Sequence, residues 1–147
     1  YTSFTNAGCT ATQEVAYRLA TGLRDCTQDL TGQSGNYTPE LSASMYVNYY
    51  KSLSAENDLE ISLSANKVGE HYSNGDNDPL GLEEESTKIN ARFSIVNNTG
   101  IEISLFARNL TDEKTASFSL DLPLVPGSHF KLWNPGKEIG LTMKKNF

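Results

Sequence analysis

The sequence predicts an all-β protein, a six-stranded antiparallel meander with long loops on one side and a short helix in the first loop. Apolar and polar residues alternate in runs of strand length, which places them on opposite faces of a strand. The connections between runs alternate between short and long, as in a meander whose two ends face different environments. A chain of 147 residues, 37% of them hydrophobic, fits one domain.

Each expected strand shows the alternation. The strands are expected at residues 1–6, 40–51, 58–69, 87–96, 101–111 and 137–147. In the clearest run, one face carries Leu41, Ala43, Met45, Val47 and Tyr49. A tight hairpin is expected at Asn97-Asn98-Thr99-Gly100, because Asn and Gly supply the backbone angles that such turns need. The long connections cover residues 7–38, 71–86 and 112–136.

The first long connection holds the helix and both cysteines. Val15, Leu19 and Leu23 recur at helical spacing between Thr12 and Arg24, with Thr12 as the expected N-cap. Cys9 and Cys26 bracket this segment, and closing a loop of that size stabilises a fold by about 3 kcal/mol. We expect a disulfide in an oxidising compartment. The alternative is two unpaired thiols in a reducing cytosol.

The net charge of −6 argues against a nucleic-acid partner, which requires a basic patch. One segment without Lys or Arg, residues 70–85, carries Glu70, Asp76, Asp78, Glu83, Glu84 and Glu85. Asp76-Asn77-Asp78 resembles the start of a calcium loop but lacks the Gly and distal Glu of that motif. We therefore expect an ordinary solvated loop, with no metal site and no cofactor. The less favoured alternative is a loop that repels acidic competitors or recruits cations.

Two architectures share this alternation, a transmembrane β-barrel and a soluble β-sandwich. The polar face carries Ser, Asn and Thr with few charges, and aromatic residues gather at strand ends, as in barrel walls. The alternative is a secreted soluble β-sandwich binding module with one disulfide. Burial of Ile61, Leu63, Phe93 and Leu105 discriminates between them, because a sandwich would cover these side chains with a second sheet.

The last forty residues carry a family resemblance. Ile103 to Lys114 reads ISLFARNLTDEK, which is similar to the penultimate strand of TonB-dependent outer-membrane receptors. The motif residues are Asn109, Leu110, Thr111, Asp112 and Glu113. Residues 126–127, 134–136 and 140–142 resemble that family's last loop and last strand, and residues 37–50 resemble an earlier strand. A terminal Phe147 is similar to the signal that the barrel assembly machinery reads.

The resemblance implies that residues 1–147 are the C-terminal portion of such a barrel. Six strands cannot close, because natural barrels have about eight or more, so the segment would be open and curved. The chain begins at Tyr1 rather than Met, and we expect a fragment or a processed product. The intact receptor would import a siderophore, cobalamin or carbohydrate across the outer membrane of a Gram-negative bacterium. Its partners would be outer-membrane lipid, its own upstream barrel and plug, and the TonB complex acting through that plug.

Few residues suggest chemistry. His71 and His129 fall in expected loops without a partnered nucleophile, so we expect no enzyme activity. His129, Phe130 and Trp133 lie close together in the final loop, where they would contact a ligand or anchor the chain at the membrane interface. Arg92, Glu102 and Arg108 would face the barrel interior and pair across strands, contact the plug or, less favoured, bind substrate.

Overall fold

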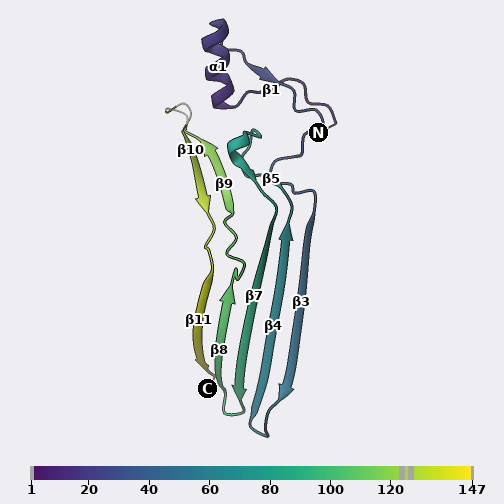
Figure 1. The fold of residues 1–147 in the computed structure, drawn as a ribbon, viewed down its shortest axis with the longest axis vertical. Helices are drawn as coiled ribbons and strands as arrows, with labels where there is room; N and C mark the ends of the chain where they lie inside the picture. The colour runs from purple at the N-terminus through teal and green to yellow at the C-terminus, as the bar shows by residue number, and fades with distance from the viewer. Residues whose placement is uncertain (1, 123–124, 126–127, 147) are drawn as a thin grey trace. The chain divides into compact units, whose positions relative to one another are not determined.

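The computed structural model describes residues 2–122, 125 and 128–146 of a mostly β chain with antiparallel sheets and one α-helix (Figure 1). The described residues fall into two compact units. The sheet unit comprises Ser42–Val68, Ser86–Lys114 and Pro135–Phe147, and the loop unit comprises Tyr1–Leu41, Gly69–Glu85 and Thr115–Asn134. The expected all-β class is confirmed.

One five-stranded antiparallel sheet forms the sheet unit, in the order β11-β8-β7-β4-β3. The strands are β3 (Ser42–Ser52), β4 (Asn57–Val68), β7 (Ser86–Asn97), β8 (Ile101–Arg108) and β11 (Glu138–Lys145). Neighbours in space follow the chain order, so the sheet is a meander as predicted, but it has five strands rather than the expected six because residues 2–6 form no strand. Among the described residues no sheet closes on itself.

The turn between β7 and β8 is the predicted hairpin. The Gly100 amide donates to the Asn97 carbonyl over 2.9 Å, and the Asn97 side chain accepts from the Thr99 amide over 2.8 Å. Gly100 has a φ of 83°, and a Cβ there would lie 2.6 Å from the carbonyl oxygen of Asn146. Glycine is therefore required both for the backbone angle and for the space.

Three two-stranded sheets and the helix form the described part of the loop unit. Its elements are β1 (Ala7–Gly8), α1 (Ala11–Thr21), β2 (Thr27–Gln28), β5 (His71–Tyr72), the 3-10 turn η1 (Pro79–Gly81), β6 (Leu82–Glu83), β9 (Ala116–Asp121) and β10 (His129–Trp133). The pairs are β1 with β2, β5 with β6, and β9 with β10. The connections at 71–86 and 112–136 are thus hairpins rather than irregular loops.

Two expectations about the first forty residues are wrong in detail. The described part of 1–6 is not a strand: the Phe4 backbone instead bonds to the Leu30 amide and to the Thr31 hydroxyl, both over 2.9 Å. The helix begins earlier than expected, because Thr10 rather than Thr12 is its N-cap and forms a capping box with Gln13. Gly22 ends the helix in the left-handed conformation.

Burial differs from that of an ordinary globular domain. The buried hydrophobic residues among those described are Ala7, Leu30 and Ala116, all in the loop unit. On one face of the sheet, the exposed large hydrophobic side chains are Met45, Val47, Tyr49, Leu63, Ile89, Phe93, Ile95, Ile103, Leu105, Ile139, Leu141 and Met143. Tyr46 and Tyr50 are exposed on the other face. In the part of the chain that the structure describes, no helix has the length and apolar character needed to span a membrane.

Candidate functional site

The strand register divides the sheet into an apolar and a polar face. Residues paired across all five strands share a face, so one row of the apolar face reads Tyr49, Ile61, Phe93, Leu105 and Leu141. The next row of the polar face reads Tyr50, Glu60, Ser94, Ser104 and Thr142. The sequence predicted this division of side chains, and the register confirms it.

Arg92 organises the centre of the polar face. Its Nη2 donates to Glu102 Oε1 over 2.6 Å and to Ser104 Oγ over 2.8 Å, while its Nε donates to Ser94 Oγ over 3.1 Å. The two serine hydroxyls bond to each other over 2.9 Å and are buried. The expected cross-strand pairing of Arg92 with Glu102 is confirmed, and most donors of this guanidinium are already engaged within the sheet.

A shallow hollow of about 340 Å³ lies beside this network. It is lined by Tyr46, Asn48, Ser62, Leu63, Ser64, Asn90, Ala91, Arg92, Phe106, Ala107 and Arg108. Arg108 lies 4.9 Å from the centre of the Phe106 ring and pairs with Glu138 over 3.0 Å. A Cβ at Gly140 would lie 2.6 Å from the Phe106 ring, so the glycine makes room for that ring on the polar face. Such a mixture of amides, hydroxyls, aromatic rings and guanidinium groups suits a polar or anionic ligand, or another protein segment.

The motif from Asn109 to Glu113 forms a turn whose side chains bond the backbone. Asn109 and Asp112 have φ values of 47° and 56°, which asparagine and aspartate tolerate better than most residues. Asn109 is buried, and its side chain both donates to the Glu113 carbonyl and accepts from the Glu113 amide, each over 3.0 Å. The Asn109 side chain therefore stabilises the turn that the motif forms.

The same motif ties three strands of the sheet together. Thr111 Oγ1 donates to the Thr87 carbonyl over 2.8 Å, and Glu113 accepts from the Thr87 amide over 3.2 Å. Asp112 Oδ1 accepts from the Lys137 amide, next to β11, over 2.9 Å. Each polar side chain here satisfies a strand-end backbone group, so the motif residues have a structural role in this chain.

Buried polar groups hold the loop unit together. Glu83 is 5% exposed; its Oε1 accepts from Lys131 Nζ over 2.8 Å and its Oε2 accepts from the Ala116 amide over 2.7 Å. Ser73 and Ser119, both buried, bond through their hydroxyls over 2.9 Å. The expectation of a solvated acidic loop is wrong for Glu83, since its cation comes from a distant segment. No local pattern in the sequence signals this pair.

The structure separates the three residues expected to act together in the final loop. His129, Phe130 and Trp133 lie on β10, and the consecutive His129 and Phe130 point to opposite faces of that strand. His129 Nδ1 lies 3.0 Å from Asp121 Oδ1, whereas Phe130 and Trp133 are exposed. Lys131 Nζ lies 5.5 Å from the Trp133 ring centre. The structure therefore shows no single cluster, and their contact with a ligand or an interface stays a prediction.

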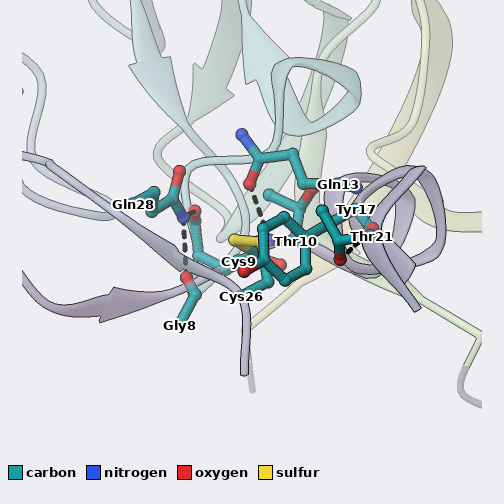
Figure 2. The surroundings of a disulfide bond; sticks show 9 residues. Gly8, Cys9, Thr10, Gln13, Tyr17, Thr21, Cys26 and Gln28 are labelled. Atoms are coloured by element: carbon teal, nitrogen blue, oxygen red, sulfur yellow. Dashed lines mark hydrogen bonds between the residues drawn. A yellow bond between two sulfur atoms is a disulfide. The ribbon is translucent and has the colours of Figure 1, made fainter. Parts of the chain in front are cut away.

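The disulfide between Cys9 and Cys26 is present, with a Cα–Cα distance of 5.6 Å (Figure 2). The carbonyl of Gly8, beside the bridge, accepts from the Gln28 side chain over 2.7 Å. At the helix start, Asp121 Oδ2 accepts from the Ala11 amide over 3.1 Å, which fixes one end of α1 to β9. Hydrogen bonds from the Thr31 side chain and backbone lower the pKa of Asp29 in the same loop.

Two further expectations concern single residues. Phe147, the expected assembly signal, lies outside the described residues. The histidines lie in the short strands β5 and β10 rather than in loops, and His71 Nδ1 bonds to the Gly69 carbonyl over 3.0 Å. Within residues 2–122, 125 and 128–146, no three His, Cys, Asp or Glu side chains converge to hold a metal ion.

Comparisons with protein-family models, with curated proteins and with solved structures give no match for this chain.

Proposed function

We propose that this chain is the C-terminal wall of the β-barrel of a TonB-dependent receptor in a bacterial outer membrane. In this role the five strands of the sheet would cross the membrane as part of the barrel wall. The intact receptor would take up a scarce nutrient, driven by the TonB complex acting on a plug encoded upstream. The chain would contribute the wall, part of the interior lining and external loops rather than chemistry.

The observation that carries the proposal is the exposed apolar face of the sheet. Leu63, Phe93 and Leu105 are 43%, 45% and 49% exposed, and Ile61 is half-buried. Monomeric soluble proteins rarely leave so continuous an apolar surface in water. Hydrocarbon would cover it, while pairing between neighbouring strands satisfies the backbone groups.

The polar face supports the same proposal. Arg92, Glu102, Ser94 and Ser104 satisfy one another, as expected for a surface that faces a water-filled or protein-filled interior. The turn at Asn109–Glu113, whose sequence is similar to that of the receptor family, joins β8 to the strands on either side. A structural role of this kind suits a motif placed where a strand leaves the wall.

A secreted β-sandwich binding module is the alternative. It would require a second sheet, supplied by another chain or by sequence beyond this one, over the apolar face. Both candidates contain the same five strands, so the environment of the apolar side chains separates them. In the sandwich these side chains would contact protein, and in the barrel they would contact lipid.

The experiment labels single cysteines on the two faces with an environment-sensitive fluorophore. Phe93→Cys and Leu105→Cys report the apolar face, and Asn48→Cys and Thr142→Cys report the polar face. Within residues 1–147 both cysteines are in the disulfide, and any free cysteine encoded upstream is replaced by serine before labelling. The protein is expressed from its complete coding sequence and reconstituted in phospholipid vesicles with brominated chains.

Quenching by brominated lipid should be strong at positions 93 and 105 and weak at 48 and 142, with the reverse order for aqueous iodide. A protein that stays monomeric and soluble without detergent, with labels at 93 and 105 shielded from both quenchers, would establish the sandwich instead.

A further inference from the structure

The hollow on the polar face of the sheet contains an uncovered aromatic ring. Two rings line this hollow, Phe106 on β8 and Tyr46 on β3. The Phe106 ring lies against Gly140 and close to the Arg108 guanidinium, so part of that ring is already covered. Tyr46 is 69% exposed, and aromatic side chains bury a large apolar area when they are covered. The Tyr46 ring is therefore a flat apolar surface that a ligand can cover.

Polar side chains with open hydrogen-bonding positions lie next to this ring. Asn48, Ser62 and Arg92 are register partners on β3, β4 and β7, so their side chains form one row across the hollow. The Asn48 and Ser62 side chains form no hydrogen bond within the described residues. Arg92 uses Nε and Nη2 within the sheet, which leaves the N–H groups of Nη1 for a ligand. The row thus offers an amide, a hydroxyl and part of a guanidinium group.

Hydrogen bonds hold the neighbouring row of the hollow in place. Asn90 Nδ2 donates to Ser64 Oγ over 3.0 Å, and Asn90 Oδ1 accepts from the Asn109 amide over 2.9 Å. Arg92 is held in the same way by its bonds to Glu102 and two serines. Because these side chains are already ordered, a ligand that binds here would lose little free energy in ordering them.

The charges at the hollow are balanced. Arg92 pairs with Glu102 over 2.6 Å, and Arg108 pairs with Glu138 over 3.0 Å. An anionic ligand would have to compete with these two carboxylates for the guanidinium groups, whereas a neutral ligand would not. This balance favours a neutral ligand that exchanges many hydrogen bonds.

We propose that the polar face of the sheet binds a neutral oligosaccharide, with one sugar ring stacked on Tyr46 and its hydroxyl groups bonded to Asn48, Ser62 and Arg92. A pyranose ring has a face of C–H bonds that packs on an aromatic ring, and a rim of hydroxyl groups that donate and accept hydrogen bonds. Tyr50, 67% exposed on the same face of β3, offers a second ring about 13 Å along the strand. A chain of several sugar units would reach both rings.

The inference goes further than the proposed function. Uptake of a carbohydrate, rather than of a siderophore or cobalamin, rests on the receptor role proposed above. The binding itself depends only on the polar face, so it would also hold in a β-sandwich whose apolar face is covered by protein.

The test measures the affinity of neutral hexasaccharides of glucose, mannose, galactose and xylose by calorimetry, for the detergent-solubilised protein expressed from its complete coding sequence. At least one should bind, and Tyr46→Ala should weaken it by about tenfold because the stacking surface is lost. Tyr46→Phe keeps the ring and should stay within about threefold of wild type. Tyr49→Ala is the matched control, since it removes the same exposed side chain from the opposite face of the same strand and should leave the affinity unchanged.

A further variant tests the hydrogen bonds separately from the stacking. Asn48→Ala keeps the Tyr46 ring and should weaken binding by about fivefold, because one amide partner of the sugar hydroxyls is lost. Circular dichroism verifies that each variant is folded.

Three results would overturn the proposal: no binding of any of the four hexasaccharides, equal losses for Tyr46→Ala and Tyr49→Ala, or tighter binding of an anionic ferric tris-catecholate that Tyr46→Ala abolishes. Lipid quenching at positions 93 and 105 reports the opposite face of the sheet, so its outcome is independent of these measurements and the two proposals fail separately.

Discussion

The two units of this chain use polar residues in opposite ways. In the sheet unit, the serines and Arg92 lie on one face of an open sheet, and the apolar side chains on the other face stay exposed. In the loop unit, the polar side chains of Ser73, Glu83 and Ser119 are buried, while apolar residues of the β9–β10 hairpin such as Phe130 and Leu132 are exposed. Among the described residues, neither unit has the large apolar core that holds most globular domains together.

The difference shows what stabilises each unit. Backbone hydrogen bonds between strands of eight to twelve residues stabilise the sheet. Its exposed apolar face would have to be covered by whatever surrounds the sheet. The loop unit has strands of two to six residues, so side-chain hydrogen bonds, an ion pair and a disulfide carry its stability. Substitutions should therefore affect the two units through different interactions.

The largest expected effect is at Glu83 in the loop unit. Glu83→Ala leaves the Lys131 ammonium group and the Ala116 amide without their partner. Breaking a buried ion pair in this way should lower the free energy of unfolding by about 3–5 kcal/mol. Hydrogen exchange at residues 116–119 should accelerate, while exchange in β7 should not change. Glu84→Ala, at an exposed neighbour, should be neutral. Equal exchange rates in the two variants would contradict the role assigned to the pair.

Removal of the disulfide should have the next largest effect, again confined to the loop unit. Cys9→Ser with Cys26→Ser opens a loop with a sequence separation of 17, and the expected loss is about 3 kcal/mol. Limited proteolysis should cut between residues 9 and 26 in this variant. Cleavage within β4 or β7 at the same rate would show that the bridge stabilises more than its own unit.

A charge on the apolar face of the sheet should be costly only in lipid. Phe93→Arg should destabilise the reconstituted protein by about 2–4 kcal/mol if residue 93 lies near the membrane midplane. Asn48→Arg, on the polar face, is the control and should have little effect. Urea titrations in vesicles measure the free energy of unfolding of both variants. A sheet whose apolar face contacts protein would also lose stability in detergent-free buffer.

Asn109→Ala should give a smaller loss, of about 1–2 kcal/mol, because alanine is strained at a positive φ. The substitution also removes the side-chain bonds to Glu113. Asn109→Gly restores the backbone freedom without those bonds and should recover part of the loss. Thermal unfolding compares the three proteins, and an alanine variant as stable as wild type would show that the turn does not need its asparagine.

Local pattern was enough to predict most of the sheet. The four strands predicted within residues 40–111, the hairpin at Gly100 and the last strand all follow from alternation and turn residues, and the structure confirms them within a few positions. The pairing of Arg92 with Glu102 followed from the same register. Prediction failed where the alternation was short, as in residues 2–6 and in the two hairpins of the loop unit.

The sequence by itself determined which side chains share a face, because a period of two is a property of the extended backbone. The disulfide between the two cysteines was also expected, and the structure confirms it. Only the tertiary structure decided that Glu83 meets Lys131 and that Asn36 lies beside Gly75. These two contacts join residues 39 to 48 positions apart, and no local periodicity encodes which distant loops come together.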